Sequence, residues 1–117
     1  MTTKEYPESI RLGPLDVRPG RYEVLVQGEP VNLTLTEFRV LLLLLDWPGW
    51  VFSRQEIVKS VHGEDYQVTD RAVDVQIVGL RKKLGKAGEL IETVRGLGYR
   101  IKDLRQGTLP TEGSSNI

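Results

Sequence analysis

The chain has 117 residues, of which 39% are hydrophobic and 27% are charged, and its formal net charge is zero. This length predicts one domain with a single modest core, and the composition is that of an ordinary soluble protein. The absence of cysteine excludes disulfides and thiolate metal sites. The apolar run 40–45 is bounded by charged residues and is too short to span a membrane. Because the N-terminus also lacks an apolar signal segment, we expect a cytoplasmic location.

The net charge of zero hides an uneven distribution of charge along the sequence. Residues 69–105 contain nine Lys and Arg against five Asp and Glu, whereas residues 1–68 contain seven against ten. Distribution is better evidence than the sum for a protein that binds a polyanion. The alternative explanation is that any helix needs a charged face towards solvent.

The first third of the chain has the pattern of a small sheet. Residues 1–8 are expected to be a linker or disordered. In the segment 10–33, four short apolar runs at 10–12, 15–18, 22–26 and 31–33 are separated by Gly-Pro, Pro-Gly and Gly-Glu-Pro, which are strong turn signals. These runs predict a four-stranded antiparallel meander, with the prolines at strand starts or turns.

Two capping boxes predict the starts of two helices. Thr34 with Glu37, and Ser53 with Glu56, have the spacing in which a hydroxyl and a carboxylate satisfy free amides at a helix start. The first helix, 35–47, is apolar on several sides and should be central, and the second covers 54–62. Three aromatic residues between them are expected in or near the core, with 51–52 as a short bridging strand: Trp47, Trp50 and Phe52.

The third helix is predicted at 70–84 and is followed by a β-hairpin at 90–102. Four apolar residues repeat at helical spacing and should face the core: Val73, Ile77, Leu80 and Leu84. The opposite face collects Arg71, Val75, Val78, Gly79 and Lys82. Gly85 ends the helix, the hairpin turns around Gly96 and Gly98, and residues 105–117 form a flexible tail.

Five motifs in this order resemble the OmpR/PhoB-type DNA-binding domain of response regulators. They are Leu35-Thr-Glu-Phe, Pro48-Gly-Trp-Val-Phe-Ser-Arg, Asp70-Arg-Ala-Val-Asp-Val, Leu80-Arg-Lys-Lys-Leu and Thr93-Val-Arg-Gly-Leu-Gly-Tyr-Arg. The resemblance covers about residues 10–102. It implies an α+β winged helix-turn-helix in one domain, 9–104. It also implies a transcription regulator whose third helix enters the major groove of DNA, whose wing reaches the minor groove or its phosphates, and which binds direct repeats as a tandem dimer.

The resemblance implies a set of DNA-binding residues: Arg71, Gln76, Val78, Gly79, Arg81, Lys82, Thr93 and Arg95. Guanidinium groups at both ends of the helix and at the hairpin tip can reach phosphates, and a Gln amide can bond to an adenine edge. For each charged residue the alternative is an ordinary solvated side chain, which is the stronger reading for Lys82. We expect Arg71, Arg81 and Arg95 to converge on one basic surface.

The sequence departs from the family at Val78 and Gly79, where better-known members tend to have basic residues. A glycine inside a helix costs about 1 kcal/mol relative to alanine, so Gly79 needs a reason. Three hypotheses remain open. The first is that Val75, Val78 and Gly79 let the helix approach closely and contact thymine methyl groups. The second is that the domain binds DNA weakly and mostly through phosphates, and the third is that the apolar patch binds a protein.

Other functions are less well supported by the sequence. The resemblance implies that the loop 63–68 can meet RNA polymerase through Glu64 and Asp65, although a plain acidic turn is the alternative. We find no set of nucleophile, base and stabiliser, so no enzyme activity, metal or cofactor is expected. An interaction module with weak, phosphate-based DNA binding is the alternative function. The chain has no room for a receiver domain, so it is either an excised effector domain or a free-standing regulator.

Overall fold

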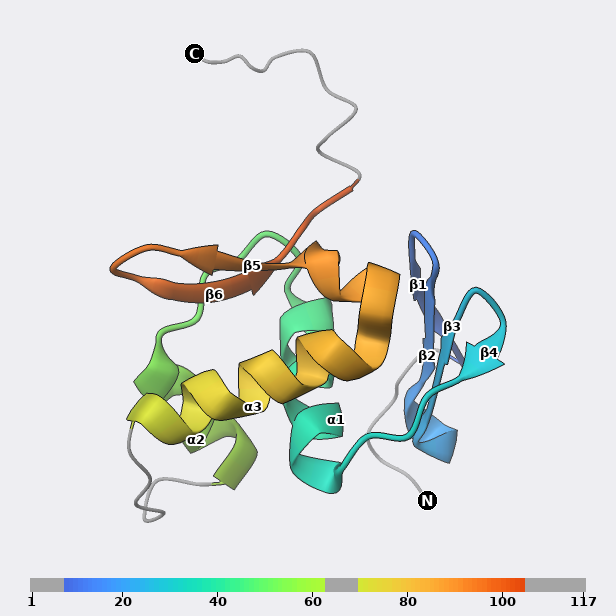
Figure 1. The fold of residues 1–117 in the computed structure, drawn as a ribbon, viewed down its shortest axis with the longest axis horizontal. Coiled ribbons are helices and arrows are strands. Elements are labelled where there is room, and N and C mark those ends of the chain that lie inside the picture. The colour runs from blue at the N-terminus through green and yellow to red at the C-terminus, as the bar shows by residue number, and fades with distance from the viewer. Residues whose placement is uncertain (1–7, 63–69, 105–117) are drawn as a thin grey trace.

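The computed structural model describes residues 8–62 and 70–104, and its elements follow the predicted order of four strands, three helices and a hairpin (Figure 1). The N-terminal sheet contains β1 (Ile10–Leu12), β2 (Leu15–Arg18), β3 (Glu23–Val26) and β4 (Glu29–Pro30), with a 3-10 turn, η1 (Pro19–Arg21), between β2 and β3. The helices are α1 (Leu35–Asp46), α2 (Arg54–His62) and α3 (Asp70–Leu84). A second 3-10 segment, η2 (Gly85–Leu90), leads to the wing strands β5 (Ile91–Val94) and β6 (Gly98–Ile101). Residues 1–7, 63–69 and 105–117 lie outside the described residues, and with them most of the predicted linker 1–8, all of the predicted loop 63–68 and the predicted tail.

The sheet is an antiparallel meander in the order β1-β2-β3-β4. The prediction of its fourth strand at 31–33 is wrong, because that strand is Glu29–Pro30, paired with Val26 and Leu25. The reason is the tight turn at Gln27 and Gly28, which both have positive φ values, 51° and 85°. Such a two-residue turn starts the return strand at once.

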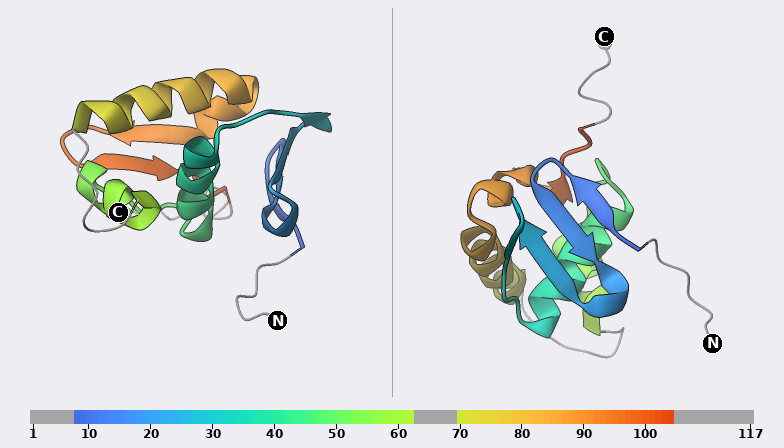
Figure 2. Two further views of the ribbon diagram at one scale, coloured as in Figure 1. Left: turned by 90° about the horizontal axis from the view of Figure 1, so that it is seen from below. Right: turned by 90° about the vertical axis from the view of Figure 1, so that its right-hand side faces the viewer.

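Helix α1 is central, as its apolar residues predicted. The sheet covers one side of it, while α3 and the wing lie on the other (Figure 2). Leu41 and Leu44 of α1 are fully buried, together with Leu15 and Val17 of the sheet. The four predicted core residues of α3 are all buried: Val73, Ile77, Leu80 and Leu84. This single core holds α3 with its opposite face towards solvent.

Both predicted capping boxes are present. The Glu37 amide donates to Thr34 Oγ1 at 3.1 Å and the Thr34 amide donates to Glu37 Oε1 at 2.9 Å. Ser53 and Glu56 form the same pair of bonds, at 3.1 and 2.8 Å. Each box satisfies amides that have no partner inside the helix, so the starts of α1 and α2 are set locally.

Two of the three aromatic residues predicted in or near the core are exposed. Trp47 and Trp50 are 58% and 59% exposed, with ring centroids 6.2 Å apart, and only Phe52 is buried. The intervening Gly49 has a φ of +84° and its amide donates to the Ile101 carbonyl at 2.8 Å. This turn ties the backbone to the base of the wing and leaves both indoles on the surface.

The wing is a two-stranded antiparallel hairpin that Phe52 joins as an isolated bridge to Tyr99. The two residues exchange backbone hydrogen bonds of 2.8 and 2.9 Å. Gly98 permits this approach, because a Cβ atom there would lie 2.0 Å from the Phe52 carbonyl oxygen. Tyr99 and Ile101 are buried. The wing is therefore anchored to the helical core at its base.

Candidate nucleic-acid interface

The outward face of α3 carries one continuous exposed stripe: Arg71, Val75, Val78 and Lys82. These residues follow each other at i, i+4, i+7 and i+11, which is the spacing of one helix face. Val75 and Val78 are 62% and 60% exposed. The neighbouring Gln76, at the edge of the face, is less exposed and is half-buried. The stripe thus has a cation near each end and two valines in the middle.

The wing turn carries two further exposed residues. Arg95 lies in the turn between β5 and β6, and Leu97 beside it is 64% exposed. Figures 1 and 2 both place the start of α3 and this turn at the same end of the molecule. The sequence did not single out Leu97. Its position between two glycines of a basic hairpin is the signal that could have found it.

Arg81 does not extend freely into solvent. Its Nε and one terminal nitrogen donate to the Ile91 carbonyl at 3.0 and 2.9 Å, and that nitrogen also donates to Thr93 Oγ1 at 2.8 Å. Two of the predicted DNA-binding residues, Arg81 and Thr93, are therefore hydrogen-bonded to each other. This contact fixes the end of α3 to strand β5.

A second polar cluster joins α2, α3 and the wing around Asp74. Arg54 Nε donates to Asp74 Oδ1 at 2.7 Å, and the Tyr99 hydroxyl donates to the same oxygen at 2.5 Å. The guanidinium carbons of Arg54 and Arg81 lie 6.0 and 5.7 Å from the centre of the Tyr99 ring, within range of cation–π attraction. The hydrogen bonds from Arg54 and Tyr99 lower the pKa of the Asp74 carboxyl, and burial together with the bond to Asp74 raises the pKa of Tyr99.

Gly79 faces α1 rather than solvent. A Cβ atom at this position would lie 3.0 Å from Glu37 Oε2, while Lys83 Nζ donates to Glu37 Oε1 at 2.7 Å. Burial raises the pKa of Glu37, but the hydrogen bonds from Lys83 and the Thr34 amide outweigh it and leave the pKa below its ordinary value. The glycine therefore makes room for a buried carboxylate, a reason that the sequence alone did not supply.

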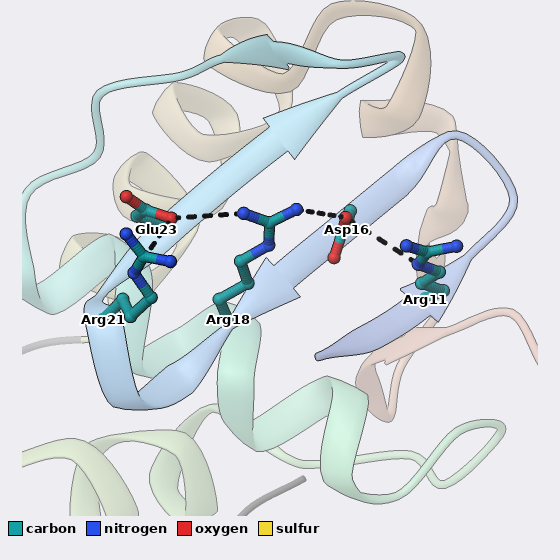
Figure 3. A network of polar contacts seen from close by, with 5 residues as sticks. All are labelled: Arg11, Asp16, Arg18, Arg21 and Glu23. Carbon is teal, nitrogen blue, oxygen red and sulfur yellow. Dashed lines mark hydrogen bonds and ion pairs between the residues drawn. The ribbon is translucent and has the colours of Figure 1, made fainter. Parts of the chain in front are cut away.

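The cations of the sheet are paired with carboxylates, whereas the cations of the stripe form no salt bridge within the described residues. Figure 3 shows three arginines that share two carboxylates across β1, β2, η1 and β3. The pairs and their distances are Arg11–Asp16 at 3.8 Å, Arg18–Asp16 at 3.4 Å, Arg18–Glu23 at 3.6 Å and Arg21–Glu23 at 3.7 Å. Within residues 8–62 and 70–104, no salt bridge joins Arg71, Lys82 or Arg95 to a carboxylate. Arg71 and Lys82 on α3 and Arg95 on the wing turn are therefore exposed cations that form no salt bridge with a described carboxylate.

In the part of the chain that the structure describes, no group of three or more His, Asp or Glu side chains is arranged to hold a metal ion, and no helix has the length and apolar character needed to span a membrane. The predicted polymerase-contact residues, Glu64 and Asp65, lie outside the described residues.

Known proteins with this sequence pattern and fold are regulators of transcription. Residues 28–101 match the family "Transcriptional regulatory protein, C terminal". The heme response regulator HssR of Staphylococcus epidermidis is 39% identical over 94 residues, and the phosphate regulon regulatory protein PhoB of Escherichia coli is 38% identical over 96. These matches cover 79% and 80% of this chain but 42% of each relative, so the chain spans less than half of their length.

A solved structure extends the similarity to three dimensions. The Klebsiella pneumoniae RstA DNA-binding domain, crystallised in complex with the RstA box, matches with a TM-score of 0.72 and 36% identity over 82% of this chain and 98% of that one. The sheet, the three helices and the hairpin correspond to its winged-helix architecture. The family consists of transcription regulators and is not a family of enzymes. The chain belongs to this OmpR/PhoB-type family of transcriptional regulatory protein C-terminal domains.

Proposed function

We propose that this domain binds double-stranded DNA and regulates transcription, with α3 in the major groove and the wing on the adjacent minor groove or phosphates. The observation that supports this function is the set of exposed cations without a described salt bridge, Arg71 and Lys82 on α3 and Arg95 on the wing turn. Family membership, and the DNA-bound RstA domain as a relative, support the same function. Such a regulator works on the chromosome, so we place it in the cytoplasm.

The proposed contacts divide into two kinds. Arg71, Lys82 and Arg95 bind phosphates and set the position of the protein on the duplex, a role that carries no sequence information by itself. Arg81 and Thr93 act chiefly on each other, so we propose that Arg81 holds the wing in position and that Thr93 presents its backbone to the DNA. We propose that Gln76, at the edge of the exposed face, reaches a base edge beside the valines.

A salt titration with a matched pair of variants tests this proposal. Affinity for a duplex should fall steeply as salt rises, because each phosphate contact releases bound counterions. Arg95→Ala should weaken binding and lower the slope of log K against log salt by about 0.9, the value for one phosphate contact. Arg21→Ala, which removes a paired arginine of the sheet, should change neither. A flat salt response in the wild type would instead favour a protein partner for the exposed face.

We also propose that two copies bind a direct repeat in tandem, as the family resemblance implies. A duplex with two head-to-tail half-sites should then bind two domains with greater affinity per domain than a duplex with one. Gel shifts on duplexes with one site, two direct repeats or two inverted repeats distinguish this arrangement. Equal affinity per domain on all three would contradict it.

A further inference from the structure

The middle of the exposed α3 stripe offers apolar groups only. Val75 and Val78 project from the helix, and the Asp74 carboxylate beside them accepts hydrogen bonds from Arg54 and Tyr99. Gln76 lies at the edge of the exposed face and not on the stripe itself. Gly79 faces Glu37. Two isopropyl groups therefore occupy the place where a recognition helix needs to meet the bases.

The cations of the stripe are spaced to straddle a major groove. Arg71 and Lys82 lie eleven positions apart, about 16 Å along a helix that rises about 1.5 Å per residue, and the groove is about 12 Å wide. Side chains at these two positions can contact phosphates on both rims. The valines between them then face the floor of the groove.

Base edges in the major groove present hydrogen-bond donors and acceptors, and one apolar group, the C5-methyl of thymine. A valine side chain cannot form hydrogen bonds with the polar groups of a base edge. A polar edge beneath a valine therefore loses its hydrogen bonds to water and gains none in return. A thymine methyl instead gains apolar contact. Residues three apart on a helix have Cβ atoms about 5–6 Å apart, which suits methyls one or two base steps apart.

We propose that Val75 and Val78 select DNA by contact with thymine methyl groups, so that each half-site has thymine at its centre. This inference rests on the proposed function, because it needs α3 in the major groove. It assigns specificity to two valines and leaves affinity to the cations at the ends of α3 and on the wing.

The test begins with the selection, from random DNA, of duplexes that the full 117-residue chain binds. Each thymine of the selected half-site is then replaced singly by deoxyuridine, which removes the 5-methyl and keeps the base pair. At one or two central positions the wild type should lose about fourfold in affinity, the value expected for one apolar group of methyl size. Replacements outside the centre should have no effect.

Variants show whether the valines are the cause. In Val75→Ala/Val78→Ala, the central replacements should cost little further affinity, because the contact is already lost. Both positions are exposed and alanine favours helix, so folding should persist. Arg95→Ala provides the control, since it should weaken binding and yet keep the fourfold deoxyuridine effect.

Three results would overturn the proposal. They are a selected site without central thymine, wild-type binding that is indifferent to every deoxyuridine, and a deoxyuridine effect that is equal in the double-alanine variant. In each of these cases a steep salt dependence would leave the proposed DNA binding intact. Failure to select any duplex, with a flat salt response, would overturn both.

Discussion

At the scale of single residues, Glu37 does more than its capping box predicted. Its carboxylate accepts from the Thr34 amide, pairs with Lys83 of α3, and occupies the space that Gly79 leaves open. Its side chain is 10% exposed, and an ionised group with so little contact with water needs such partners. One carboxylate thus sets both the start of α1 and its distance from α3.

Stability should depend on pH through this carboxylate. Because its pKa is lower in the folded state, Glu37 stabilises the fold above the pKa of the unfolded chain, and this contribution disappears as pH falls through the folded pKa. Glu37→Gln keeps the capping shape but removes the charge, and should lose about 1–2 kcal/mol at pH 7. Urea unfolding at pH 7 and below pH 4 measures the difference, which should shrink in acid. An equal loss at both pH values would contradict this role.

Gly79→Ala should fail to give the gain in stability that helix propensity predicts. Alanine favours a helix interior by about 1 kcal/mol over glycine, but its methyl would press on the Glu37 carboxylate. In a Glu37→Ala background the same change should be stabilising by up to about 1 kcal/mol. The double-mutant cycle is measured by chemical unfolding, and an equal effect in both backgrounds would show that Gly79 has another purpose.

At the scale of elements, the wing is held to α3 by one arginine and one tyrosine. Arg81 grips β5 through Ile91 and Thr93, and Tyr99 of β6 donates to Asp74. A hairpin of two strands is barely stable by itself, so the wing needs contacts of this kind. Neither contact can be predicted from the hairpin sequence alone, because each involves a residue of α3. The wing therefore takes its direction from α3, and the two elements can meet one duplex together.

Removal of Arg81 should loosen the wing more than the helix. In Arg81→Ala, amide hydrogen exchange should become faster in β5 and β6. The reason is that local opening of the wing no longer requires the hydrogen bonds from Arg81 to Ile91 and Thr93 to be broken. Exchange in α1 should stay nearly unchanged. Lys82→Ala, one residue away and exposed, serves as the control and should leave the wing amides protected. Equal exchange in both variants would argue against the anchoring role.

At the scale of the whole molecule, a net charge of zero does not prevent attraction to a polyanion. The arginines of the sheet are engaged in ion pairs (Figure 3). Helix α3 and the wing, which carry Arg71, Lys82 and Arg95, lie on the opposite side of α1 from the sheet (Figure 2). Within a Debye length of about 10 Å at 0.1 M salt, a phosphate backbone responds to the nearby charges and not to the sum.

A charge swap at constant net charge tests this. Arg95→Glu combined with Glu29→Lys should lower the salt slope of duplex binding by about two, since one favourable contact becomes a repulsion. Arg21→Glu combined with Glu29→Lys has the same net charge and should bind as the wild type does. Binding that follows net charge alone would be equal in the two variants.

The sequence by itself determined the order of the elements and the buried stripe of α3, but it misplaced the fourth strand and put Gly79 on the outward face. The capping boxes of Thr34 and Ser53, and the apolar stripe of α3 that includes Val73 and Leu80, are patterns within a few residues. Capping hydrogen bonds and the helical period involve only residues that are close in sequence, so these features do not depend on distant parts of the chain. The exposed stripe of α3 followed from the same period.

Only the tertiary structure decided what several side chains do. Arg54 and Asp74 are 20 residues apart in sequence, Asp74 and Tyr99 are 25 apart, and Glu37 and Lys83 are 46 apart. Such contacts depend on how the elements pack, as does the exposure of Trp47 and Trp50 at a turn tied to the wing. Local pattern specifies which side chains are available, and packing across the core decides which of them remain free to meet DNA.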